Sequence, residues 1–123
     1  MTQGDRQDEA LGVIVRLLRG DDRFDYECDW FTMRDAALQI LPLQETMPMA
    51  TASSISPSGM QLAGKYGIGA LSIASTSKEG LQALPTQWSF AEEAAAANGQ
   101  TVTRNDWRVL MSWHLPLIPI SAP

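Results

Sequence analysis

Cysteine and histidine are almost absent from this sequence, which has one of each, Cys28 and His114, in 123 residues. A single cysteine forms no disulfide within its own chain, and one cysteine with one histidine is too few for a structural zinc site. So little cysteine is typical of a protein in a reducing compartment. We therefore predict that the protein holds no metal and works in the cytoplasm.

Positive charge and long hydrophobic runs are scarce as well. Nine Lys and Arg residues are scattered among fourteen Asp and Glu, so the net charge is −5, which argues against a surface for nucleic acid or anionic lipid. No apolar run reaches the roughly 20 residues of a membrane span, and the first ten residues are too polar and acidic for a secretory or transit peptide. The composition favours an acidic enzyme that acts on small molecules, with no nucleic acid and no membrane as partner.

The sequence does contain enough apolar residues, 45%, for one globular domain with a core. Apolar periodicity predicts helices over residues 8–19, 57–66 and 77–98, the last of which kinks or restarts at Pro85. It also predicts a hairpin over 24–33 and strands over 49–52, 68–74 and 107–115. Strand and helix alternate after residue 49, which predicts a parallel sheet. Three such strands fit part of an open doubly wound sheet or part of a closed (β/α)8 barrel, and both leave sheet edges unpaired.

The end of the chain differs in composition from the rest. Residues 116–123 contain three of the seven prolines, and proline excludes a regular helix there. We predict one domain over residues 1–115, followed by a disordered tail over residues 116–123.

The predicted hairpin places Phe24, Tyr26 and Trp30 on one face, alternating with acidic residues on the other. Such a strand lies half-buried at a surface, so the hairpin is a candidate surface for a partner. Cys28 shares the aromatic face, and we interpret it as an inert buried thiol.

Residues 49–66, MATASSISPSGMQLAGKY, combine a strand, a serine-rich turn and the start of a helix. The groups that gather at the helix N-terminus are the hydroxyls of Ser53, Ser54, Ser56 and Ser58 and the backbone N–H groups around Gly59. A helix N-terminus carries unsatisfied donors and partial positive charge, so this turn is a candidate phosphate site. The alternative is a cap without a ligand, in which Ser56 caps the helix and Pro57 opens it.

Three blocks of the chain, residues 8–44, 50–75 and 79–115, together resemble the bacterial luciferase-like flavin-dependent monooxygenases. They begin DEALGVIVRLLRG, ATASSISPSGMQLAGKYGIGAL and EGLQALPTQWSFAEE, and they cover nearly the whole chain. The likeness is closest to the branch with limonene-monooxygenase-like and alkanal-oxidising members. Because that family folds as a (β/α)8 barrel, the resemblance implies an α/β fold: a partial TIM barrel with roughly the fifth to seventh strands and a small inserted β-hairpin.

The resemblance also implies a function and a site. Family members use reduced FMN and O2 to oxidise a small organic substrate, take the reduced flavin from a flavin reductase, and commonly form homodimers. In the family, the loop after the fifth barrel strand holds the FMN phosphate through hydroxyls and backbone N–H groups. By position, Ser53, Ser56 and Gly59 fall on those contacts, and Ser54 and Ser58 lie beside them.

Other residues have weaker claims to a role in the chemistry. His114 ends the last predicted strand and could act as a general base, because imidazole titrates near neutral pH, but a structural role is the alternative. Trp88 and Trp107 could stack on a flavin, although their spacing predicts core positions.

The chain also departs from the family. The strands that carry the catalytic and isoalloxazine-facing residues have no counterpart in this sequence, so we expect a piece of a longer enzyme that is inactive by itself. Two alternatives remain open. One is a catalytically silent fragment or interaction module that binds no cofactor, and the other is a deazaflavin-dependent reductase, because the same barrel accepts that cofactor.

Overall fold

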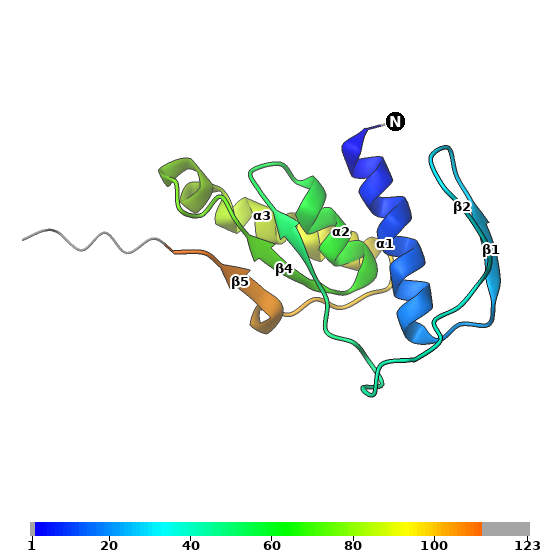
Figure 1. Ribbon diagram of the computed structural model, residues 1–123. Helices are drawn as coiled ribbons and strands as arrows, with labels where there is room; N and C mark the ends of the chain where they lie inside the picture. Colours follow the sequence, from blue (N-terminus) through cyan, green and yellow to red (C-terminus); the bar gives the residue numbers. More distant parts are fainter. Residues whose placement is uncertain (1, 112–123) are drawn as a thin grey trace, which may run out of the picture.

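The computed structural model describes residues 2–111. The elements in chain order are α1 (Gln3–Arg19), β1 (Phe24–Glu27), β2 (Thr32–Ala36), β3 (Ala50–Ser53), α2 (Ser58–Tyr66), β4 (Gly69–Ser72), α3 (Lys78–Ala97), the 3-10 helix η1 (Arg104–Asp106) and β5 (Trp107–Val109) (Figure 1). Every predicted helix and strand has a counterpart in this order. The predicted tail of residues 116–123 and His114 lie outside the described residues.

Helix α1 begins at Gln3, ahead of the predicted start at residue 8. Thr2 and Asp5 form a capping box: the Asp5 N–H donates to the Thr2 hydroxyl at 3.2 Å, and the Thr2 N–H donates to the Asp5 carboxylate at 2.7 Å. The predicted start lies too far along the chain because it rests on apolar periodicity, and the first turn of the helix is polar. The helix ends as predicted at Gly20, whose φ of 72° is left-handed.

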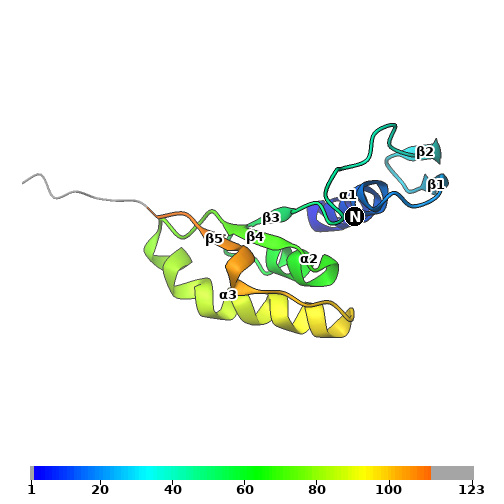
Figure 2. The same ribbon diagram turned by 90° about the horizontal axis from the view of Figure 1, so that it is seen from below.

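Strands β3, β4 and β5 form a parallel sheet in that order, with Ala50 opposite Gly69 and Ala70 opposite Trp107. Helices α2 and α3 connect these strands and lie together on one side of the sheet (Figure 2). This is the predicted alternation of parallel strands and crossover helices. It brings the carboxyl ends of the strands to one edge of the sheet, where ligand loops lie in α/β folds.

The core lies between the sheet and helices α2 and α3. Its buried members are Met60, Ala63, Ala70, Trp88 and Ala91. Met60 is 0% exposed, and the ring of Trp88 stacks on that of Trp107 with centroids 5.2 Å apart. Trp88 therefore belongs to the core, as its spacing predicted, and Trp107 is partly buried and packs against it.

The opposite face of the sheet has no helix over it in residues 2–111, and Figure 2 shows it open. Ala50 and Ala52 are exposed there, and Ile73, just after β4, is 45% exposed. Within the described residues β3 and β5 each pair only with β4. Both sheet edges are therefore unpaired in this part of the chain, as predicted.

The predicted hairpin forms a two-stranded antiparallel sheet of its own beside α1 (Figure 1). Its second strand runs Thr32–Ala36, so the prediction of a strand ending at residue 33 was too short. The indole N–H of Trp30 donates to the Glu9 carboxylate at 2.7 Å, which attaches the hairpin to α1. Cys28 is half-buried, not fully buried as predicted, because it lies in the turn between the strands.

Helix α3 runs through Pro85 without a break, so a restart of the helix there, one of the two predicted outcomes, was wrong. Pro85 is exposed, whereas Trp88, Ala91 and Ala95 on the same helix are buried. Packing of that face stabilises the helix across the hydrogen bond that proline cannot make. Among the helices of residues 2–111, none is long and apolar enough to span a bilayer.

Candidate functional site

The serine-rich turn lies at the carboxyl end of the parallel strands. β3 ends at Ser53 and α2 begins at Ser58, so residues 54–57 cross from the sheet to the helix at that edge. Ser54 and Ser56 are exposed and Ser58 is partly exposed. The structure thus brings three of the predicted hydroxyl groups to the surface beside the start of α2.

Helix α2 starts without a side-chain cap. Pro57 occupies the N-cap position in a helical conformation, with φ −71° and ψ −17° and no side-chain hydrogen bond. The alternative in which Ser56 caps the helix is therefore wrong, because its hydroxyl lies 3.1 Å from that of Ser58 instead. Within the described residues, no side chain accepts a hydrogen bond from the first backbone N–H groups of α2.

Ser53 is placed differently from the other serines. Its side chain is buried, with the residue 1% exposed, and its hydroxyl donates to the Gln87 side-chain carbonyl at 3.0 Å. Gln87 lies on α3 and is 3% exposed. The structure therefore places Ser53 beneath the turn, in contact with α3, and not on the surface of the turn.

Gln87 is the member of this site that the sequence analysis did not identify. Its spacing from Leu84 and Ala91, three residues before it and four after it, puts a polar side chain on the apolar face of α3. A buried amide needs polar partners, so a glutamine in that position was the available signal.

Gly59 has a packing role at the same place. A Cβ atom on Gly59 would overlap the Ala52 carbonyl oxygen and lie 2.8 Å from the Ser53 Cα. Only glycine lets the first turn of α2 approach the end of β3 this closely. The residue thus sets the position of the helix N-terminus, and its backbone N–H is part of that terminus.

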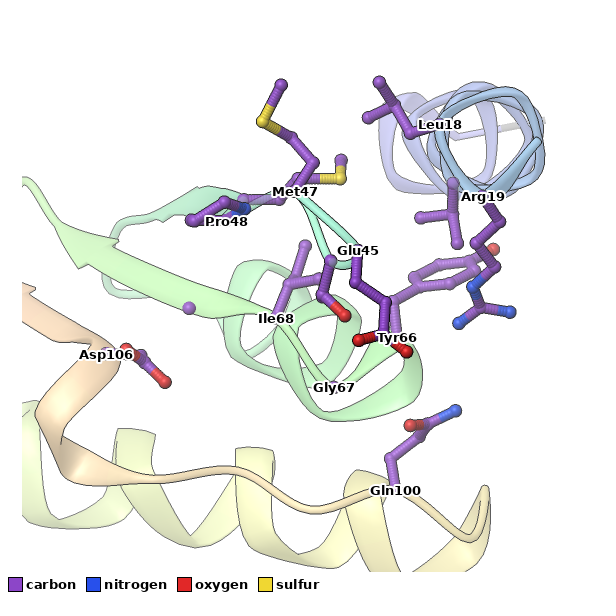
Figure 3. Close-up of a pocket in the computed structure, with 14 residues that line it drawn as sticks. Leu18, Arg19, Glu45, Met47, Pro48, Tyr66, Gly67, Ile68, Gln100 and Asp106 are labelled. Carbon is purple, nitrogen blue, oxygen red and sulfur yellow. The ribbon is translucent and has the colours of Figure 1, made fainter. Parts of the chain in front are cut away.

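A cavity of about 460 Å³ lies at the opposite, amino-terminal end of the strands (Figure 3). Met49 and Gly69 line it near the starts of β3 and β4, together with Glu45, Arg19 and Asp106. Active sites of barrel enzymes lie at the carboxyl ends of the strands, so this cavity is at the wrong end for catalysis in such a fold. We therefore assign the candidate site to the serine turn.

A second polar cluster joins α1 to α2. Tyr66 donates its hydroxyl proton to the Asp8 carboxylate at 2.6 Å, and the Lys65 ammonium lies 2.6 Å from the other carboxylate oxygen. Burial, then the hydrogen bond to Asp8 and its negative charge, raise the pKa of Tyr66 above its ordinary value. The cluster holds the two helices together on the side away from the serine turn.

The raised pKa of Tyr66 predicts a loss of stability in alkali. Above about pH 10 the unfolded tyrosine loses its proton while the folded one keeps it, so the free energy of unfolding falls as the pH rises. Urea denaturation of the wild-type protein and Tyr66→Phe at pH 8 to 11 measures this. The free energy of unfolding of Tyr66→Phe should be roughly 1 kcal/mol lower than that of the wild-type protein at pH 8. It should also fall less steeply as the pH rises to 11.

Tyr26→Phe is the matched control. Burial also raises the pKa of Tyr26, but no hydrogen bond from its hydroxyl to a carboxylate is present in residues 2–111. Tyr26→Phe should therefore change the alkaline fall in the free energy of unfolding less than Tyr66→Phe does. Equal slopes for the wild-type protein and Tyr66→Phe would contradict the assignment.

Metal-binding groups do not gather anywhere in residues 2–111: no cluster of three or more His, Cys, Asp or Glu side chains is placed to hold an ion. The chemical groups of the candidate site are hydroxyls and backbone N–H groups. These groups suit an anion.

Comparison with known proteins assigns the chain to a family. The family model of the luciferase-like monooxygenases matches residues 2–114, nearly the whole chain. The chain belongs to this family. The predicted family resemblance is therefore confirmed.

Two curated relatives of this luciferase-like chain are monooxygenases. Limonene 1,2-monooxygenase of Rhodococcus erythropolis is 44% identical over 110 residues, covering 89% of this chain and 28% of the relative. The 4-hydroxyprotoasukamycin monooxygenase of Streptomyces nodosus subsp. asukaensis is 42% identical over 113 residues, covering 89% and 30%. The chain thus spans less than a third of the length of these relatives.

Two solved structures share the fold. The monooxygenase RslO1 of Streptomyces bottropensis superposes with a TM-score of 0.69 at 19% identity, over 85% of this chain and 31% of its own. An F420-dependent secondary alcohol dehydrogenase, solved with an F420-acetone adduct, gives a TM-score of 0.59 at 22% identity, over 88% and 31%. At these identities the likeness shows the fold alone. The luciferase-like chain has the predicted α/β fold of part of a (β/α)8 barrel.

Proposed function

We propose that this chain carries the phosphate-holding segment of an FMN-dependent luciferase-like monooxygenase. The observation that supports this most directly is the uncapped N-terminus of α2, which stands at the carboxyl end of the parallel strands beside three accessible serine hydroxyls. Unsatisfied N–H donors and the positive end of a helix dipole attract a phosphate.

The residues of the turn fit a phosphate monoester. Ser54, Ser56 and Ser58 supply hydroxyl donors, and Ser58 and Gly59 supply backbone N–H groups at the first turn of α2. Residues 54–59 contain no acidic side chain that would repel the anion. Ser53 supports the turn from below through Gln87 instead of contacting the ligand.

The proposed activity follows from the family. Reduced FMN, when bound, would supply the two electrons that reduce O2, so that one oxygen atom enters a small organic substrate and the other leaves as water. The residues described in this chain bind and orient the phosphate end of that cofactor. A flavin reductase as the source of reduced FMN, a homodimeric assembly and a cytoplasmic location remain predictions from the resemblance and the composition.

A deazaflavin-dependent reductase is the second candidate function. It is favoured by the fold shared with the F420-dependent alcohol dehydrogenase. A chain that binds neither cofactor would instead be a silent fragment or interaction module of the same family. Both flavin-type cofactors therefore belong in the binding test.

Titration of FMN with the purified chain, followed by quenching of flavin fluorescence, tests the proposal. We expect saturable binding at micromolar concentrations, weakened about tenfold in Ser56→Ala, because a hydrogen bond to a charged group contributes about 1.5–3 kcal/mol. Ser89→Ala is the matched control, since that partly exposed serine lies on α3 and donates to the Thr86 carbonyl.

The outcomes separate the candidates. Absence of saturable FMN binding with saturable F420 binding favours the reductase, and absence of both favours the silent fragment. Equal FMN affinity of the wild-type protein and Ser56→Ala would remove Ser56 from the site.

A further inference from the structure

Gln87 connects α3 to the serine turn through both ends of its side-chain amide. Its carbonyl oxygen accepts the Ser53 hydroxyl proton at 3.0 Å. Its NH2 group donates to the Ile55 carbonyl at 2.6 Å and lies 3.5 Å from the Ser56 carbonyl. One buried side chain therefore contacts three residues of the turn, Ser53, Ile55 and Ser56.

These contacts fix the direction of a peptide unit. In a trans peptide the C=O and N–H groups point in opposite directions. Because the Ile55 carbonyl points inward to Gln87, the Ser56 N–H of the same peptide points away from α3. Within residues 2–111 no protein group accepts a hydrogen bond from that N–H. It is a donor on the side of the turn that faces away from Gln87.

Packing alone does not require an amide at this position. The neighbours of Gln87 along the buried face of α3 are Trp88 and Ala91, and an apolar side chain of the same length would fill the space. A buried glutamine must satisfy its polar atoms, and this one does so only by holding the turn. Its hydrogen bonds thus serve the shape of residues 53–56.

We propose that Gln87 is a positioning residue that holds the turn with its Ser56 N–H and hydroxyls facing a phosphate monoester. The inference rests on the proposed function for the identity of the ligand. The arrangement of the turn by Gln87 is a property of the ligand-free chain.

The test replaces Gln87 by methionine, which keeps the length of the side chain and removes its hydrogen bonds. Gln82→Met is the matched control, because Gln82 is exposed on the same helix. Two measurements are made on the full chain and both variants. The first is the backbone order parameter of residues 54–56 by NMR without ligand, and the second is the ratio of the dissociation constants for riboflavin and FMN, which differ only by the phosphate.

We expect the order parameters of residues 54–56 in Gln87→Met to fall from about 0.85 to below about 0.6, with those of α2 and α3 unchanged. FMN should bind about tenfold more weakly to this variant while riboflavin binding stays the same, so the ratio falls. Gln82→Met should leave both measurements unchanged. A general loss of stability would weaken the binding of both ligands equally and would leave the ratio of the two dissociation constants unchanged.

Each opposing result has a separate meaning. Unchanged order parameters in Gln87→Met overturn the positioning role, whatever the flavins do. An ordered turn in the wild-type protein that loosens in Gln87→Met, with no preference of the wild-type protein for FMN over riboflavin, overturns the proposed phosphate site and the assignment of the ligand. If the wild-type protein prefers FMN and the ratio is unchanged in Gln87→Met, the proposal that Gln87 positions the turn for the phosphate is overturned.

Discussion

Trp88→Ala should lower the free energy of unfolding by about 3–5 kcal/mol, a large share of the roughly 5–15 kcal/mol that stabilises a domain. Trp88 is 5% exposed, stacks on Trp107 and packs in the core between the sheet and α3. Truncation removes its buried apolar area and leaves a cavity that the surrounding elements fill only in part. Urea denaturation followed by far-UV circular dichroism measures the change.

Trp88→Phe is the control for this prediction. The indole N–H of Trp88 is buried and has no hydrogen-bond partner among the described residues, so phenylalanine removes an unsatisfied donor while keeping a ring. We expect a cost of roughly 1 kcal/mol. If alanine cost no more than phenylalanine, the Trp88 ring would not be the centre of the core.

Gly64→Ala should destabilise the chain by about 2 kcal/mol, although alanine favours a helix by about 1 kcal/mol over glycine. A Cβ atom on Gly64 would overlap the Ala91 carbonyl oxygen and lie 2.7 Å from the Ala94 Cβ on α3. Backbone atoms of α3 cannot move aside as a flexible side chain can. The variant must therefore separate α2 from α3, the two helices that cover the core on one side of the sheet.

Gly4→Ala provides the matched comparison for Gly64→Ala. Gly4 also lies in a helix, but the nearest atom to its Cβ position is the Thr2 hydroxyl oxygen at 3.6 Å. Differential scanning calorimetry should show an unchanged or slightly raised midpoint for this variant and a lowered one for Gly64→Ala. Equal midpoints for the wild-type protein and Gly64→Ala would contradict the close packing of α2 on α3.

Part of the candidate site can be predicted from the local sequence pattern, and part of it cannot. The serines and the start of α2 near Pro57 follow from residue types at adjacent positions, since hydroxyls and a helix N-terminus are local features. The cap was wrong because the choice between Ser56 and Pro57 depends on the direction in which a hydroxyl points. In the structure the Ser56 hydroxyl lies beside that of Ser58, while the backbone of the turn is held by Gln87 of α3, more than thirty residues along the chain.

The boundaries of the elements show the same division. The left-handed turns at Gly20 and Gly67 follow from the sequence, because glycine adopts positive φ without a steric cost. The continuity of α3 through Pro85 does not, because the packing of a distant face outweighs the local penalty of proline.

The sequence by itself determined the order of strands and helices, the family and the position of the serine turn, because periodicity, turn residues and motif spacing are properties of neighbouring residues. Only the tertiary structure decided that Ser53 lies buried on Gln87, that α2 starts uncapped at the carboxyl edge of the sheet, and that the cavity lies at the other edge. These features depend on which distant side chains meet when α2 and α3 pack on the same face of the sheet. The directions of the Ser53 hydroxyl and of the Ile55 carbonyl are fixed by such distant contacts, which residue types at neighbouring positions do not reveal.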